Sequence, residues 1–435
     1  MPDLEGTIAR LEANDPTLES IELIKGDIND DKATRLATAL KTSTIPALTS
    51  MDLSSNEIDD AGATALAEAL AHNTTLTAVG LYDNNISNTG AIALAEALKR
   101  NRTLTSLELW ENKIGDTGAS AIASALQEHN QTLTLIELGN NKISSTGASA
   151  LAQALENNTT LISMNLGWNT TIGAKGARAL SEALKTNKTL RHLSLDQTNT
   201  GAKGAEALAE ALKLNHTLEL LDLKHNNIGT QGATAIANAL ASNTTLIELK
   251  LGYNNIGIEG TRALIETLLR LNKTLSILHL GGNNIGDEGA IALAKFLQHN
   301  TTLTKLKLVH NNIGDAGVIA LAEALKHNET LLSLELDHNE FGPLGTAALQ
   351  DIKIILARNN AKTDAPIGLL PLAADTEHDI SPMARSTTAP PTREEDRRTV
   401  VINPMRRDAA TAFQTATRPK MAAKSADTGC RCTIQ

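Results

Sequence analysis

The last four residues of this 435-residue chain, from Cys432 to Gln435, carry its clearest chemical signal. A Cys four places from the end, with an aliphatic residue next to last and a terminal Gln, matches the C-a-a-X pattern for farnesylation, although Thr433 departs from the aliphatic ideal. Cys430 is the candidate for a second, palmitoyl chain, because one prenyl chain alone gives only marginal membrane attachment. The pattern predicts a lipid anchor at the cytosolic face of a eukaryotic membrane. The alternative is an unmodified chain end.

The other reactive side chains are not spaced for small-molecule chemistry. His310 and His338 occupy equivalent positions 28 residues apart, but two His without a third ligand make a weak site, so we expect no bound metal. The sequence contains no nucleophile elbow, phosphate-binding loop or metalloprotease helix. We therefore expect neither an enzyme nor a cofactor. The two Cys both lie in the last six residues and offer the folded part no disulfide.

Composition indicates a repetitive core. Aromatic residues make up only 2% of the chain against 41% hydrophobic residues, which is too few rings for an ordinary globular core. Leu recurs in the frame L-x-x-L-x-L-x-x-N-x-I, with steps of 28 or 29 residues after a first step of 30. The twelve frames begin at Leu18, Leu48, Leu76, Leu104, Leu133, Leu161, Leu190, Leu218, Leu246, Leu275, Leu303 and Leu331. The net charge of −10 argues against nucleic-acid binding.

Each frame predicts a short strand followed by a helix. L-x-L alternation gives a strand with one buried face, and ATALAEAL after Gly62 has the spacing of an amphipathic helix. A helix between successive strands favours parallel pairing. Where the chain leaves each strand, a buried amide can satisfy the backbone groups that lose their ladder partners. Gly26 and Thr198 replace this Asn in two of the frames. The other ten frames carry Asn56, Asn84, Asn112, Asn141, Asn169, Asn226, Asn254, Asn283, Asn311 and Asn339.

An N-x-T triplet also recurs once per repeat. We expect its Asn to close the preceding helix in the left-handed region; the alternative is a glycosylation acceptor. The positions are Asn73, Asn101, Asn130, Asn158, Asn187, Asn215, Asn243, Asn272, Asn300 and Asn328.

Helix-bearing repeats of this length resemble the ribonuclease-inhibitor subclass of the leucine-rich repeat family. Over residues 18–358 the resemblance implies an α/β solenoid, a horseshoe with parallel strands on its concave face and helices on its convex face. Residues 1–17 are interpreted as an N-terminal cap, and the segment from Pro343 as a C-terminal capping helix. Residues 359–435 hold seven of the eleven Pro and no periodicity, which predicts a disordered tail.

The resemblance places the binding surface on the concave strands and the loops that leave them. All four Trp and Tyr fall there, and aromatic anchors are typical hot spots of protein interfaces. The alternative is that rings are excluded from an Ala-rich core. Tyr82 and Trp110 share one column of adjacent strands, about 4.8 Å apart, so their rings can touch. The candidate binding residues are Tyr82, Trp110, Glu108, Glu111, Glu137, Trp168, Lys250 and Tyr253.

Charge on this surface is expected to orient a partner; ordinary solvated charge is the alternative. Acidic residues lie in repeats three to five, and basic residues lie in repeats eight to eleven. They are Asp83, Glu108, Glu111 and Glu137 in the first group, and Lys224, Lys250, Lys305 and Lys307 in the second.

The uniform repeats, the few aromatics and the C-a-a-X-like end also resemble leucine-rich-repeat effectors of intracellular bacterial pathogens. That resemblance implies a monomeric, non-enzymatic scaffold that binds a protein, a small GTPase among the candidates, at a host membrane. The alternative function is a GTPase activator of the Ran type, which has similar repeats and a C-terminal tail. In that family the tail is acidic, whereas from Arg397 onward this chain has eight basic residues against two acidic ones.

Overall fold

The computed structural model describes residues 3–363, which form thirteen helices and twelve strands. Cys430, Cys432 and the rest of the predicted tail lie outside this range. The helices are α1 (Leu4–Glu12), α2 (Asp30–Thr42), α3 (Asp60–Leu70), α4 (Asn88–Arg100), α5 (Asp116–Glu128), α6 (Ser145–Asn157), α7 (Gly173–Thr186), α8 (Gly201–Leu212), α9 (Gly229–Leu240), α10 (Gly257–Arg270), α11 (Gly286–Leu297), α12 (Asp315–Leu325) and α13 (Pro343–Thr363). The strands are β1 (Ser20–Glu22), β2 (Ser50–Asp52), β3 (Ala78–Gly80), β4 (Ser106–Glu108), β5 (Leu135–Glu137), β6 (Ser163–Asn165), β7 (His192–Ser194), β8 (Leu220–Asp222), β9 (Glu248–Lys250), β10 (Ile277–His279), β11 (Lys305–Lys307) and β12 (Ser333–Glu335).

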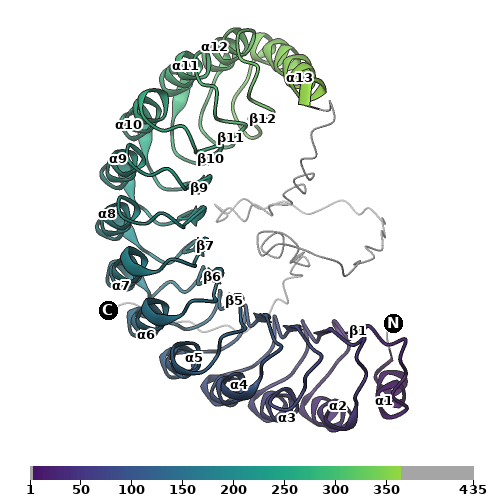
Figure 1. The fold of residues 1–435 in the computed structure, drawn as a ribbon. Helices are drawn as coiled ribbons and strands as arrows, with labels where there is room; N and C mark the ends of the chain where they lie inside the picture. Colours follow the sequence, from purple (N-terminus) through teal and green to yellow (C-terminus); the bar gives the residue numbers. More distant parts are fainter. Residues whose placement is uncertain (1–2, 364–435) are drawn as a thin grey trace, which may run out of the picture. The chain divides into compact units, whose positions relative to one another are not determined.

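All twelve strands form one parallel sheet in sequence order. Each strand starts two residues after the Leu that opens its frame, and equivalent residues pair across every step, as Glu108 does with Glu137. Within residues 3–363 the strands line the inner side of the curved array and the helices line the outer side (Figure 1). The predicted α/β solenoid is confirmed.

The core lies between the strand and helix layers. The frame residues Leu104, Leu107 and Leu109 are buried, and so are Ala119 and Ala123 on the helix that follows them. Because Ala is small, the two layers approach closely without rings between them. One buried apolar cluster runs from the first helix to the last.

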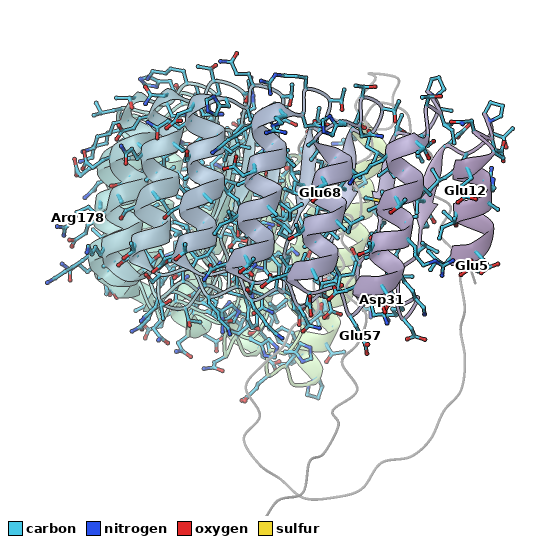
Figure 2. The ribbon with its side chains drawn as sticks, turned by 90° about the horizontal axis from the view of Figure 1, so that it is seen from below. Glu5, Glu12, Asp31, Glu57, Glu68 and Arg178 are labelled. Atoms are coloured by element: carbon cyan, nitrogen blue, oxygen red, sulfur yellow. The ribbon has the colours of Figure 1, made fainter. Side chains whose placement is uncertain are left out.

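Some of the charges on the outer side are paired between neighbouring helices. Glu5 on α1 pairs with Arg35 on α2 at 2.6 Å, and Glu68 on α3 pairs with Lys41 on α2 at 2.7 Å. Figure 2 labels Glu5 and Glu68 on this side. Such exposed pairs add little stability. Other exposed carboxylates on these helices, such as Glu12 on α1 and Asp31 on α2, form no ion pair within residues 3–363.

The last helix is longer than predicted. The sequence predicts a boundary at residue 358, but α13 continues to Thr363. Asn359 is buried, and its amide donates to the backbone oxygens of Asn328 and Leu331 at 3.1 and 2.9 Å. These bonds attach the extra turn to the preceding repeat, so the capping helix does not end where the helical sequence pattern weakens.

The strand-exit Asn residues bridge successive repeats. In Asn112, Oδ1 accepts from the Ile86 N–H at 3.0 Å, and Nδ2 donates to the backbone oxygens of Leu81 and Leu109 at 2.9 and 3.2 Å. The same amide also reaches the Trp110 backbone oxygen. One side chain therefore satisfies backbone groups of two repeats and fixes the turn that presents Trp110.

The prediction for the N-x-T triplets was wrong in its mechanism. Asn187 has φ −63° and ψ 134°, an extended conformation, so it does not close its helix in the left-handed region. Its Nδ2 donates to the Leu155 backbone oxygen at 2.7 Å, while its Oδ1 accepts from the Leu190 N–H at 2.8 Å. Asn187 is also buried. The triplet forms a second hydrogen-bonded ladder, which a glycan on Asn187 would disrupt.

No helix within residues 3–363 is both long enough and apolar enough to cross a membrane.

Candidate protein-binding surface

The eighth residue of every frame, here called the exit residue, adopts a left-handed conformation. These residues are Lys25, Ser55, Asp83, Glu111, Asn140, Trp168, Gln197, His225, Tyr253, Gly282, His310 and His338, with φ from 48° to 66°. The conformation costs a non-Gly residue roughly 1–2 kcal/mol, yet only Gly282 avoids that cost. Because all twelve exit residues share this conformation, the turn is a general feature of the repeat. It sets the position of the Trp168 and Tyr253 side chains at the end of their strands.

Two of the four rings rest on glycines of the next repeat. A Cβ at Gly139 would lie 1.9 Å from the Trp110 ring, so the indole occupies the space above that residue. Likewise, a Cβ at Gly282 would lie 2.3 Å from the Tyr253 ring. Both rings therefore lie along the row of strand exits.

The other two rings are held by polar contacts to the next repeat. The Tyr82 hydroxyl donates to Glu111 Oε2 at 3.0 Å, and Trp168 Nε1 donates to Asp196 Oδ2 at 3.1 Å. Tyr82, Trp110 and Trp168 are all half-buried. Their orientations are thus largely set before any partner arrives.

Carboxylates surround these three rings. We use the term outward positions for the third, fifth, seventh and eighth residues of each frame. The second residue can also be exposed, as is Arg191 of frame seven, which pairs with Glu219. In frames two to seven the outward positions carry no Lys or Arg, and we call them the acidic face. The six carboxylates of the acidic face are Asp52, Asp83, Glu108, Glu111, Glu137 and Asp196. Its one His, His192, is buried, and burial lowers its pKa, so it adds no compensating charge near neutral pH.

Two of these carboxyls titrate far from their ordinary range. Burial and the nearby Asp52 raise the pKa of Glu108 to about 7. Burial and the nearby Glu108 raise the pKa of Glu137 to about 8, although the Asn165 amide donates to Glu137 Oε2 at 2.7 Å. Both side chains keep some contact with solvent. Near pH 7 the pair is therefore partly protonated and poorly compensated.

The lysines of repeats eight to eleven do not form the free basic surface expected from the sequence. Lys250 is only 9% exposed, and its Nζ lies 3.4 Å from Glu248 Oε1. Lys307 is 3% exposed, and its Nζ lies 3.5 Å from Glu335 Oε2. The outward positions of frames eight to twelve hold four lysines and four carboxylates. The charges of this half therefore balance one another. Lys250 itself is buried in an ion pair with Glu248.

A row of rings near the C-terminal end was not foreseen from the sequence. His225 stacks on Tyr253 with centroids 4.3 Å apart and planes at 7°, and His310 stacks on His338 at 4.2 Å and 2°. Parallel stacked imidazoles direct their nitrogen lone pairs side by side, which does not suit a shared metal ion. Within residues 3–363 no group of three His, Cys, Asp or Glu could hold a metal. A search for rings at equivalent frame positions would have found this row.

Comparison with known proteins identifies repeats along most of the described chain. Residues 2–113 match a family model described as the TMOD/LMOD leucine-rich domain. A second model, described as Leucine Rich repeat, matches residues 129–152, 157–181, 186–209, 214–237, 242–264, 271–294, 299–322 and 327–349. No match was found among curated proteins.

Two solved structures are similar to parts of the chain. One, described as Leiomodin-1 Actin-Binding Site 2, is 26% identical over 36% of this chain and 91% of that chain, with a TM-score of 0.31. The other, the Rad7 and Elc1 complex in yeast, is 14% identical over 77% of this chain and 82% of that chain, with a TM-score of 0.45. With twelve parallel strands in register and two leucine-rich models matched along its length, the chain is a leucine-rich-repeat protein.

Proposed function

We propose that this protein is a non-enzymatic scaffold that binds another protein on the acidic face, with Tyr82 and Trp110 as central anchors. The observation that carries the proposal is that three rings stand on the acidic face, where the strand carboxylates Asp52, Glu108 and Glu137 form no ion pair within residues 3–363. Large rings surrounded by polar groups are the usual hot spots of protein interfaces.

The anchors are favourable because their geometry is set in advance. Trp110 is positioned by Gly139 and by the Asn112 bond to its backbone, and Tyr82 by its bond to Glu111. Binding therefore orders few additional side-chain torsions, and less of the interaction free energy is lost as entropy.

The scaffold is further proposed to act at the cytosolic face of a eukaryotic membrane, as a secreted bacterial effector in a host cell. Support for the tether comes from the C-a-a-X-like end at Cys432, with Cys430 as a palmitoyl acceptor. Support for the effector role comes from the resemblance of the uniform repeats together with that end. A lipid anchor would confine the binding surface to the region near the membrane.

The ring substitutions test the proposed binding surface. The full chain captures a partner from a eukaryotic lysate, and the purified partner is then titrated against variants. We expect Tyr82→Ala and Trp110→Ala each to weaken binding by about 1–3 kcal/mol, and the double change to be non-additive, because the two rings share one surface.

The matched control is His225→Ala with Tyr253→Ala, which removes two rings from the balanced half. Unchanged partner binding by Tyr82→Ala/Trp110→Ala, or an equal loss in the control, would rule out the acidic face as the site. A parallel assay of GTP hydrolysis by Ran should show only the intrinsic rate; acceleration would favour the activator function.

A further inference from the structure

We propose that the partner presents a Lys- or Arg-rich segment, whose cations sit along the row formed by Asp52, Glu108 and Glu137. This inference rests on the proposed binding function and names the chemistry of the partner.

The two halves of the inner surface provide an internal comparison. In the C-terminal half each strand carboxylate has a lysine of the same protein close by: Glu248 lies 3.4 Å from Lys250, Glu335 lies 3.5 Å from Lys307, and Asp222 lies 3.9 Å from Lys224. On the acidic face, within the described part of the chain, Asp52, Glu108 and Glu137 form no ion pair. Strand carboxylates are thus paired with lysines in the C-terminal half of the array, whereas Asp52, Glu108 and Glu137 on the acidic face are not.

Strand register brings these three carboxylates into one row. Glu108 and Glu137 are directly paired residues of β4 and β5, and Asp52 pairs with Gly80, which in turn pairs with Glu108. A Cβ at Gly80 would lie 2.8 Å from Asp52 Oδ1, so the Asp52 side chain leans over Gly80 towards Glu108. Glycine at this position lets carboxylates two strands apart influence each other.

The length of the row suits an extended basic segment. At about 4.8 Å per strand, Asp52 and Glu137 lie roughly 14 Å apart along the sheet. Alternate residues of an extended peptide are about 6.6 Å apart, so three cations at alternate positions span roughly 13 Å. A segment with basic residues at every second position, crossing the strands, therefore matches the overall length of the row, in which Asp52 lies two strands from Glu108 and Glu108 one strand from Glu137.

The rings beside the row add a second attraction for cations. Tyr82 and Trp110 follow β3 and β4 directly, within two residues of the paired positions Gly80 and Glu108. An ammonium or guanidinium group is attracted to the face of such rings, and more strongly where water is excluded. Burial, and then repulsion from a neighbouring carboxylate, opposes ionisation of Glu108 and Glu137. A bound cation favours the charged form of both, so binding should release protons.

The test uses a fluorescein-labelled peptide of alternating Lys and Ser, titrated by anisotropy into the full chain at low ionic strength. We expect Glu108→Gln/Glu137→Gln to weaken binding by about tenfold or more. The matched control, Glu12→Gln/Glu68→Gln, removes two carboxylates from the helical side (Figure 2) and should leave binding within about twofold. Affinity for the peptide should also rise between about pH 6 and pH 8 in the wild type, and change little in the Glu108→Gln/Glu137→Gln variant.

Equal weakening in both double variants, or equal binding of a peptide of alternating Glu and Ser, would overturn the inference. Failure of the Lys peptide to bind, while Tyr82→Ala/Trp110→Ala still abolishes partner binding, would also overturn it and leave the proposed scaffold function intact. Circular dichroism of each variant establishes that the fold is retained.

Discussion

Gly139 shows how one missing side chain positions a candidate binding residue. The Trp110 indole lies where a Cβ of residue 139 would stand, and Tyr253 has the same relation to Gly282. The rings thus owe their orientation to glycines one repeat further along the chain.

We predict that Gly139→Ala displaces the Trp110 ring without unfolding the protein, because the new methyl group meets only a partly exposed side chain. Tryptophan emission should shift, and partner binding should weaken by about 1 kcal/mol or more. The control is Gly115→Ala, where the added Cβ would meet its nearest atom, Asn88 Oδ1, at 3.3 Å. Unchanged emission and binding in Gly139→Ala would show that the ring position is unimportant.

Glu108 and Glu137 should make stability depend on pH. Their folded pKa values of about 7 and about 8 exceed the ordinary value of 4.5. Between about pH 4.5 and 8 the folded chain therefore holds more protons than the unfolded chain, and the free energy of unfolding falls as pH rises. At pH 8, the free energy of unfolding of Glu108→Gln/Glu137→Gln should exceed that of the wild type by roughly 1–3 kcal/mol. This range is reduced to allow for the partial solvent exposure of both side chains.

Urea unfolding at about pH 5.5 and pH 8 measures this difference. Between these two pH values Glu108→Gln/Glu137→Gln should lose less stability than the wild type. The control variant Glu12→Gln/Glu68→Gln should show the same dependence of stability on pH as the wild type. Parallel pH profiles of wild type and the Glu108→Gln/Glu137→Gln variant would show that these carboxyls titrate normally.

At the scale of the repeat, a buried amide serves two neighbouring elements at once. Asn226 Nδ2 donates to the Leu195 backbone oxygen at 2.6 Å, and its Oδ1 accepts from the N–H groups of Thr198 and Thr200 at 3.1 and 2.9 Å. Asn226→Leu leaves these backbone groups buried without partners and should cost about 3 kcal/mol or more. His225→Ala removes one ring of a stacked pair and should cost about 1 kcal/mol. If urea unfolding ranks the two changes in the opposite order, the assigned register is wrong.

The periodic sequence is sufficient to predict the strands, their order and the helix layer, because each frame repeats the same buried Leu positions. It is not sufficient to predict the backbone conformation of the N-x-T Asn. Asn is favoured at this position both when it ends the helix in a left-handed conformation and when it is extended and bonds to backbone groups through its side chain. The periodic sequence also could not show that Lys250 is buried against Glu248, which depends on side chains of one strand and its neighbours. The sequence does not reveal the ring row from His225 to His338, because a His at a repeated position suits a metal ligand and a stacked ring equally.

At the scale of the whole molecule, the repeats present a surface while the predicted C-terminal lipid would set its location. We predict that Cys432→Ser releases a fluorescently tagged chain to the cytosol of a eukaryotic cell, because prenylation must come first. Cys430→Ser should retain part of the protein on internal membranes, because a single chain attaches reversibly. Imaging beside the wild type measures both. A wild-type signal as diffuse as that of Cys432→Ser would remove the anchor and leave a soluble scaffold.

The central claim is that a protein partner binds on the acidic face. Hydrogen exchange of the full chain, alone and with the captured partner, tests this claim most directly. The account predicts slower amide exchange in the exit segments 82–84, 110–112, 139–141 and 167–169, with the helices α3 to α6 unchanged. Slower exchange confined to the helices, or to the exit segments of frames eight to twelve, would contradict it.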